Sequence, residues 1–159
     1  DGDEMKTLVP SLGYILMDEA SGNYFGKRLL IDYYYNQMPL EIAQEFKNEF
    51  NLDVDYIKKN LYRTPNPNMY LASFAKFMFI FKDNDYIKEI ITCGFQEFFK
   101  YKILPFNKTA ETPIYFIGSI AHYFRDILEE IAEKNSLKIT DIIQRPIDNL
   151  LAYHKENIG

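Results

Sequence analysis

Apolar residues recur every three or four positions along most of the chain, a spacing typical of helices that bury one face. From Ser21 onward, Phe25, Leu29 and Tyr33 form one such row, which predicts the first helix. Further helices are predicted from the same spacing over residues 38–51, 53–63, 69–81, 85–104, 119–136 and 145–157. Most of the chain is therefore predicted to be helical.

Three shorter stretches have the pattern of strands. Residues 113–118, "PIYFIG", are a run of β-forming apolar residues, and residues 137–144, "LKITDIIQ", are a second such run. Residues 5–16 mix β-branched residues with a proline and a glycine, and predict a strand that ends in a turn. Strand, helix and strand in this order are typical of a crossover unit, whose strands are parallel. The predicted fold class is α/β, helix-rich, with a small mixed sheet.

The composition predicts a globular domain with an aromatic core. The chain has 13 Tyr and 13 Phe among 159 residues, and each buried ring removes a large apolar area from water. This length suffices for one domain with a core and is short for two. We therefore predict a single domain over residues 1–159.

Charge and hydropathy exclude several classes of function. The net charge is 18 − 23 = −5 without a basic block, which argues against nucleic acid as a partner. No apolar run reaches about eighteen residues, so no membrane span is predicted. Cys93 is the single cysteine, which excludes an internal disulfide and fits a reducing, cytoplasmic location. The chain does not begin with Met, and we expect it to be a piece of a longer protein.

Gly118 and Ser119, at the junction of a predicted strand and helix, are the first candidate site. A glycine there leaves backbone N–H groups open to a ligand. The alternative is a tight turn in which Ser119 is the N-cap of the helix. No Walker loop and no G-x-G-x-x-G occurs in the chain, so the common phosphate-binding signatures are absent.

Asp18 and Glu19, before the first predicted helix, are the second candidate site. Ionised carboxylates accept hydrogen bonds, so they suit a hydroxyl-rich ligand or a cation. The alternative is that both acids only complement the positive end of the helix dipole. The small residues 20–22 directly after them favour a ligand role, because they leave the backbone uncovered.

The remaining residues with reactive side chains form no recognisable set. His122, His154 and Cys93 have no second ligand at metal spacing, so no metal site is predicted. The row Tyr33-Tyr34-Tyr35 lies at helical spacing and is interpreted as packing. No Ser/His/Asp or Cys/His arrangement is recognisable, and no catalytic residue is predicted.

Three blocks of the sequence together resemble a known family. They are "PSLGYILMDEASGNYFGKRLL" (10–30), "NMYLASFAKFMF" with "DNDYIKEI" (68–90), and "PIYFIGSIAHYFRDILEEIAEKNSLKITDIIQRPIDNLLAYH" (113–154). They resemble, in the same order, the second domain of the N-acetylglucosamine kinase type of ATPase. That group includes the activator ATPases of 2-hydroxyacyl-CoA dehydratases, within the actin, sugar-kinase and heat-shock-chaperone superfamily.

The resemblance implies a ribonuclease H-like (actin-like ATPase) fold of two lobes, with ATP and sugar in the cleft between them. This chain would be the C-terminal lobe, and its partner would be the N-terminal lobe. The missing lobe would carry the catalytic aspartate and the loop that binds ATP and Mg²⁺. The residues implied for sugar binding are Ser11, Leu12, Gly13 and Asp18, and those implied for the nucleotide are Gly118, Ser119, Ala72 and Ala75.

Two positions depart from the family pattern. Met17 and Ala20 occupy the places where the family has glycines on either side of the acid pair. Larger side chains there crowd a loop that the family leaves bare. The resemblance therefore predicts the fold more firmly than it predicts which sugar is bound.

The function implied is phosphorylation of an amino-sugar hydroxyl, with N-acetylglucosamine the expected substrate, by the longer protein. The isolated fragment is expected to be inactive. One alternative is an ATPase that activates a dehydratase or reductase, although such activators hold an iron–sulfur cluster through cysteines and this chain has one. Another is a non-catalytic sensor or interaction domain of the same fold. Formation of a homodimer is left open.

Overall fold

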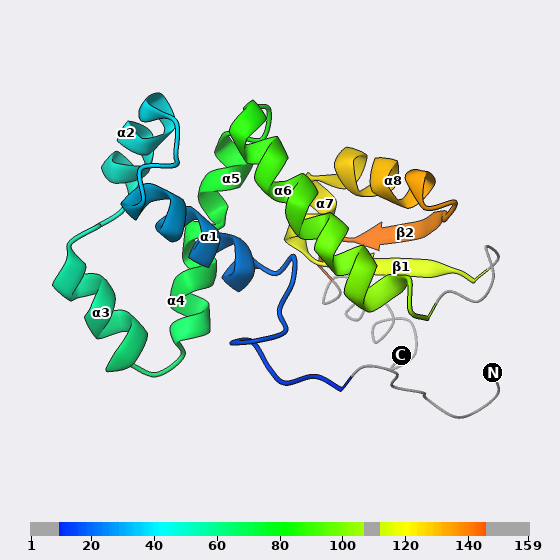
Figure 1. Ribbon diagram of the computed structural model, residues 1–159, viewed down its shortest axis with the longest axis horizontal. Coiled ribbons are helices and arrows are strands. Elements are labelled where there is room, and N and C mark those ends of the chain that lie inside the picture. The colour runs from blue at the N-terminus through cyan, green and yellow to red at the C-terminus, as the bar shows by residue number, and fades with distance from the viewer. Residues whose placement is uncertain (1–9, 107–111, 146–159) are drawn as a thin grey trace, which may run out of the picture. The chain divides into compact units, whose positions relative to one another are not determined.

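The computed structural model describes residues 10–106 and 112–145 (Figure 1). The chain divides into two compact units, Asp1–Phe106 and Asn107–Gly159, and each is described by itself. The single domain over residues 1–159 stays a prediction. The closing helix predicted over 145–157, with His154, lies outside the described residues except for Arg145.

Unit 1 consists of helices wherever it is regular. They are α1 (Gly22–Tyr34), α2 (Leu40–Glu49), α3 (Val54–Tyr62), α4 (Pro67–Phe74), α5 (Lys76–Ile80) and α6 (Asp85–Phe98), and after them comes a π-helical turn, η1 (Phe99–Ile103). The helices predicted from periodicity are confirmed in this unit. Residues 10–16 contain a turn and no strand, and residues 5–9 of the strand predicted there are outside the described part.

Side chains just before three helices fix where those helices begin. Ser21 Oγ accepts a hydrogen bond from Tyr24 N at 3.1 Å, and Asp53 Oδ1 accepts one from Tyr56 N at 2.8 Å. Asn84 does the same for α6. Each satisfies a backbone N–H that the first helical turn leaves without a partner.

Three predicted helices change their winding along their length. The helix expected over 69–81 begins at Pro67 and breaks at Ala75, whose N–H bonds to Ala72 O three residues back instead of four. The helix expected over 119–136 breaks at Phe124, where φ is −115° and ψ is 34°. The helix expected over 85–104 ends in η1, where Leu104 N bonds to Phe99 O five residues back. Periodicity does not resolve such local changes of winding, because the buried stripe continues across them.

An aromatic cluster forms the core of unit 1, as the composition predicts. Phe46 on α2 is fully buried, and its ring centroid lies 5.8 Å from that of Phe74 and 5.1 Å from that of Phe77. Tyr33 at the end of α1 and Phe50 after α2 pack on the same ring, at 5.7 Å and 4.9 Å. The cluster holds α2 to α1, α4 and α5.

Helices α1 and α4 approach so closely that their backbones touch. A Cβ atom built on Gly26 would lie 1.8 Å from Leu71 O and 2.7 Å from Leu71 C. One turn earlier on α1, a Cβ on Gly22 would lie 3.3 Å from Ala72 Cβ. The absence of a side chain at residue 26 is therefore what allows this helix pair to pack.

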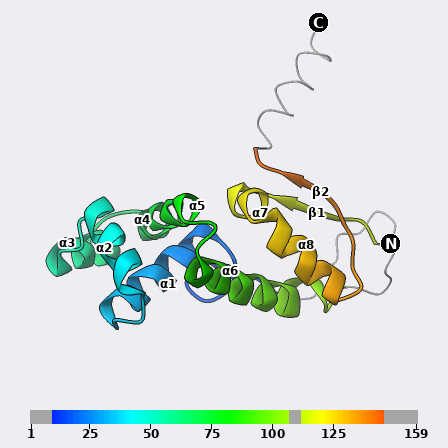
Figure 2. The same cartoon turned by 90° about the horizontal axis from the view of Figure 1, so that it is seen from above.

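Unit 2 is a crossover unit, as predicted. Strand β1 (Ile114–Ile117) leads into α7 (Ser119–Tyr123) and α8 (Arg125–Lys134), and the chain returns as β2 (Ile139–Ile143). The two strands pair in parallel, and α8 runs beside them (Figure 2). The antiparallel pairing that a mixed sheet requires is not seen in the part of the chain that the structure describes.

Candidate functional site

The turn before α1 is closed by its own backbone. Gly13 adopts a φ of 84°, and its carbonyl oxygen accepts hydrogen bonds from Leu16 N and Met17 N at 3.2 and 3.0 Å. Ser21 N then bonds to Asp18 O at 3.2 Å, which brings the chain into α1. We call residues 11–21 the Asp18 loop.

Asp18 takes part in a network at the start of α1. Its Oδ2 accepts hydrogen bonds from Ser21 Oγ at 2.6 Å and from Asn23 Nδ2 at 2.9 Å. Asn23 Nδ2 also donates to Tyr14 O at 3.0 Å. Among the hydrogen bonds of the described residues, none goes to Asp18 Oδ1. One oxygen of this carboxylate is therefore held by the protein, and the other is free to accept from a ligand.

Glu19 and Asn23 each bury an oxygen without a hydrogen-bond partner. Glu19 Oε2 lies 3.6 Å from Lys102 Nζ, which is an ion pair but too long for a strong hydrogen bond. Asn23 is 7% exposed, and its Oδ1 accepts no hydrogen bond. A buried acceptor without a donor is costly, and each such group calls for an explanation.

These groups border a cavity of about 150 Å³, which we call the Asp18 cavity. Three carboxylates and one ammonium group reach its lining, together with an amide, two phenol rings and two aliphatic side chains. The lining residues are Tyr14, Ile15, Leu16, Asp18, Glu19, Asn23, Tyr24, Lys27 and Glu97. Because acceptors outnumber donors here, the cavity favours a ligand that donates hydrogen bonds and disfavours an anion.

Two tyrosine hydroxyls tie the first and last turns of α6 to α1. Tyr24 donates to Glu97 Oε2 at 2.9 Å, and Tyr86 donates to Asp32 Oδ2 at 2.9 Å. Asp32 is 3% exposed and is also paired with Arg28 Nε at 2.9 Å. Burial raises the pKa of both tyrosines well above 10, and the neighbouring carboxylate in each pair raises it further. Both phenols therefore keep their protons and act as donors.

These raised pKa values predict an alkaline loss of stability. In the unfolded chain Tyr86 loses its proton near pH 10, whereas in the folded chain it loses it at higher pH. The stability it contributes is therefore complete below pH 10 and is lost as the pH rises above 10. We expect Tyr86→Phe to make the free energy of unfolding fall less steeply between pH 9 and pH 11 (roughly the range set by these values).

Urea titrations at a series of pH values measure this slope. Tyr62→Phe, on an exposed ring of α3, is the matched control and should leave the slope as in the wild type. Equal slopes for wild type and Tyr86→Phe would contradict the assignment.

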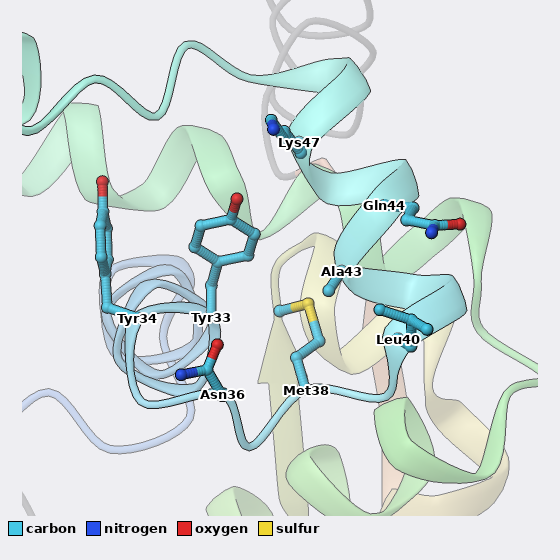
Figure 3. Close-up of a pocket in the computed structure, with 8 residues that line it drawn as sticks. All are labelled: Tyr33, Tyr34, Asn36, Met38, Leu40, Ala43, Gln44 and Lys47. Carbon is cyan, nitrogen blue, oxygen red and sulfur yellow. The ribbon is translucent and has the colours of Figure 1, made fainter.

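A second cavity, of about 500 Å³, lies between the end of α1 and α2 (Figure 3). Tyr33 and Tyr34 project side by side from α1, and Met38 points toward Ala43 on α2. Tyr34 donates its hydroxyl proton to Leu52 O. The cavity is open to solvent and holds none of the residues predicted for sugar or nucleotide binding.

The other residues predicted for the sugar lie at the start of the Asp18 loop. Ser11 Oγ accepts a hydrogen bond from Gly13 N at 3.3 Å, and the Leu12 side chain is exposed. Neither Ser11, Leu12 nor Gly13 lines the Asp18 cavity. Of the four, the structure brings only Asp18 to it.

Gly118 connects β1 to α7 in unit 2. Its φ is 129°, a backbone conformation that residues with a side chain rarely adopt. A Cβ atom built there would meet no atom within 4 Å. It is also the N-cap of α7, and Ser119 is the first residue inside the helix. The alternative in which Ser119 is the N-cap is therefore wrong, since the carbonyl of Gly118 accepts the first helical hydrogen bond, from His122 N.

The two alanines predicted for the nucleotide lie in the packed part of unit 1. Ala72 contacts the Gly22 position on α1, and Ala75 is buried between α4 and α5. Their role toward a nucleotide stays a prediction. Within residues 10–106 and 112–145, no three His, Cys, Asp or Glu side chains are grouped as metal ligands would be.

Ala20, which stands where the family has a glycine, has a backbone conformation typical of glycine. Its φ is 61°, in the left-handed region where glycine is the usual residue. The loop therefore keeps a backbone shape suited to glycine although the residue is alanine. Met17 does not adopt a positive φ, and its Sδ lies 3.4 Å from Leu12 N.

Three residues in or beside the cavity carry roles that the sequence does not predict. Asn23 could have been found, because it shares a helical row with Gly26 and Leu30, both buried, and a polar residue in a buried row is informative. Glu97 lies 73 residues along the chain from Tyr24, its hydrogen-bond partner. Lys102 is farther still along the chain from Glu19, with which it forms an ion pair. No local signal marks Glu97 or Lys102.

Comparison with known proteins finds a clear likeness among solved structures. No protein-family profile and no curated protein sequence matches the chain. Among solved structures, a proposed N-acetylglucosamine kinase from Porphyromonas gingivalis superposes with a TM-score of 0.85 and 33% sequence identity. The match covers 100% of this chain and 56% of that protein, so the chain spans little more than half of its neighbour's length.

This likeness confirms the fold class and supports the family resemblance seen in the sequence. The chain is a helix-rich α/β protein with a small parallel sheet, similar to part of a kinase-like neighbour. Among the helices in the described ranges, none combines the length and hydrophobicity needed to cross a bilayer. The cytoplasmic location stays a prediction.

Proposed function

We propose that this chain is the second lobe of a sugar kinase of the N-acetylglucosamine kinase type. The longer protein would transfer the γ-phosphoryl group of ATP to a hydroxyl of an amino sugar, with N-acetylglucosamine the expected substrate. The likeness to the Porphyromonas gingivalis protein, at 33% identity over the whole chain, supports this class. The observation that carries the proposal is the Asp18 cavity, which is lined by three carboxylates and in which the described part of the protein engages only Oδ2 of the Asp18 carboxylate.

Sugar hydroxyls can donate hydrogen bonds to the carboxylates of this lining. Asp18 presents its free Oδ1, while Ser21 and Asn23 hold Oδ2 in place. A carboxylate fixed in this way orients a hydroxyl without rearranging as the ligand binds, which is how phosphoryl-transfer enzymes gain much of their rate. Asp18 is therefore assigned to positioning the sugar.

Gly118 is the residue of unit 2 that fits a nucleotide. Open space where its Cβ would stand allows a flat or bulky group to approach the backbone. When bound, Mg·ATP supplies the phosphoryl group, and the metal site and the catalytic base are assigned to the other lobe. The activator ATPase and the non-catalytic domain stay alternatives, and no contact in the described residues favours either.

Asp18→Ala in the longer protein tests the proposal. We expect kcat/KM for N-acetylglucosamine to fall by about ten- to a hundredfold, the loss expected on removal of a charged hydrogen-bonding group. The melting temperature should also fall, because Asn23 Nδ2 loses one of its two acceptors, but the N-cap bond from Tyr24 N to Ser21 Oγ remains and the protein should stay folded. A coupled assay of ADP release with the sugar as variable substrate measures this loss.

Asp55→Ala, which removes an exposed acid on α3, is the matched control and should keep wild-type kinetics. Unchanged kinetics for Asp18→Ala would remove the sugar role. Turnover by the isolated 159-residue chain would instead contradict its assignment as one lobe of two.

A further inference from the structure

Asn23 combines burial with an unused acceptor. Of the described residues, two polar ones are buried, Asn23 and Asp32. Both carboxylate oxygens of Asp32 are engaged, by Arg28 and Tyr86. Asn23 Oδ1 has no partner, although the residue borders the Asp18 cavity. A buried amide oxygen left in this state costs about 1–3 kcal/mol, so its retention beside a cavity needs a reason.

The orientation of the Asn23 amide is set by its neighbours. Both of its N–H bonds have acceptors, Tyr14 O at 3.0 Å and Asp18 Oδ2 at 2.9 Å. A rotated amide would place its oxygen against a carbonyl oxygen and a carboxylate, three acceptors with no proton between them. The nitrogen therefore faces the loop, and the amide is fixed as a donor to Asp18 and to the Tyr14 carbonyl.

The same amide determines which oxygen of Asp18 the protein uses. Asn23 Nδ2 and Ser21 Oγ both donate to Oδ2, which restricts rotation of the carboxylate. Because Asn23 also donates to Tyr14 O, it joins the turn at the start of the loop to the acid near its end. Loss of the amide would free both the turn and the carboxylate.

We propose that Asn23 is a positioning residue for Asp18: it holds Oδ2 of that carboxylate, so that Oδ1 is presented to a hydroxyl of the ligand in the Asp18 cavity. This inference rests on the proposed function, because it takes the ligand to be a sugar. With Asp18, Glu19 and Glu97 in the lining, the carboxylate that Asn23 orients selects a neutral polyol over a phosphorylated one.

Binding of N-acetylglucosamine to the longer protein tests the role of Asn23. Amide chemical shifts of residues 18–23, followed by NMR during titration with the sugar, report occupation of the cavity. We expect Asn23→Ala to weaken this binding by about tenfold or more, since it removes a hydrogen bond to the Asp18 carboxylate and one to the Tyr14 carbonyl. N-Acetylglucosamine 6-phosphate, which differs from the sugar only by the phosphate, should bind more weakly than N-acetylglucosamine.

Asn60→Ala is the matched control. Asn60 also donates its Nδ2 to a backbone carbonyl, Tyr56 O at 2.8 Å, but lies on α3 outside the cavity. It should bind the sugar as the wild type does. The dispersion of the NMR spectrum and the melting temperature show whether each variant is folded.

Asn23→Asp keeps the size of the side chain, so it separates hydrogen bonding from packing. Its readout is the pH dependence of sugar binding, which a change in packing alone would not alter. At neutral pH it sets two carboxylates against each other, and we expect binding as weak as in Asn23→Ala. At lower pH two adjacent carboxyl groups share one proton, which restores a donor toward Asp18 and should recover part of the binding. Glu19, Glu97, Lys27 and Lys102 also face this region, so the ratio of variant to wild-type affinity is compared at each pH.

Each outcome decides between the two proposals. Wild-type shifts that persist unchanged in both Asn23 variants, or a variant Asn23→Asp without recovery at low pH, would overturn the role of Asn23 and leave the sugar assignment in place. If residues 18–23 of the wild-type longer protein do not respond to the sugar, the sugar assignment is overturned and this inference with it. If Asn23→Ala does not fold, Asn23→Asp alone gives the decision.

Discussion

Replacing Gly26 with alanine is expected to lower the free energy of unfolding of unit 1 by about 3 kcal/mol or more. The new methyl group would lie 1.8 Å from Leu71 O, where neither atom can yield without moving a helix backbone. Flexible side chains can rotate away from such an overlap, but a carbonyl inside α4 cannot. Helices α1 and α4 must therefore separate, and the contacts along the pair weaken together.

Gly22→Ala is the matched control for this variant. It adds the same methyl group to the same helix, one turn away and also facing α4, but at 3.3 Å from Ala72 Cβ. A shift of a few tenths of an ångström accommodates it, and the expected change is under about 1 kcal/mol. Urea unfolding followed by circular dichroism measures both variants. Equal stabilities for the two would show that α1 and α4 are not in backbone contact at Gly26.

Phe46→Ala is expected to cost about 3–5 kcal/mol, the usual range for deletion of a buried ring. The ring is fully buried and has four aromatic neighbours among the described residues, Tyr33, Phe50, Phe74 and Phe77. Since α2 depends on this ring for its attachment to the rest of unit 1, the substitution should also loosen the helix. Hydrogen exchange of the α2 amides, measured with the urea midpoint, would show this loosening.

Leu40→Ala on the same helix is the comparison for Phe46→Ala. Leu40 is 76% exposed, so its loss should change the stability by about 0.5 kcal/mol or less. A Phe46→Ala variant as stable as Leu40→Ala would mean that the aromatic cluster is not the core of unit 1.

Helical periodicity predicts the elements well where one face of a helix is buried without interruption. The row Phe25, Leu29 and Tyr33 predicts α1, which the structure confirms, and Asp53 caps α3 through its bond from Tyr56 N. These signals are local, because a cap and the first helical turn lie within four residues. The parallel pairing of β1 and β2 agrees equally with the strand, helix and strand order.

Changes of winding and long-range contacts cannot be predicted from such local signals. The breaks at Ala75 and Phe124 lie within continuous apolar stripes, so periodicity runs through them. Glu97 reaches Tyr24, and Lys102 reaches Glu19, only because α6 and η1 pack beside the start of α1. That packing depends on the whole of unit 1. The acid pair can be read from the sequence. The other residues that line the cavity beside it cannot.

The left-handed backbone at Ala20 has a consequence for how the Asp18 loop gets its shape. For alanine this conformation lies about 1–2 kcal/mol above the right-handed one, so the loop sequence alone adopts it only in a small fraction of molecules. The start of α1 imposes this geometry, since Ser21 caps the helix and Ser21 and Asn23 together hold Asp18. A peptide with the sequence of this loop, cut free of the helix, would spend most of its time in other shapes. The acid pair is therefore a recognition element only as part of the folded helix to which it is attached.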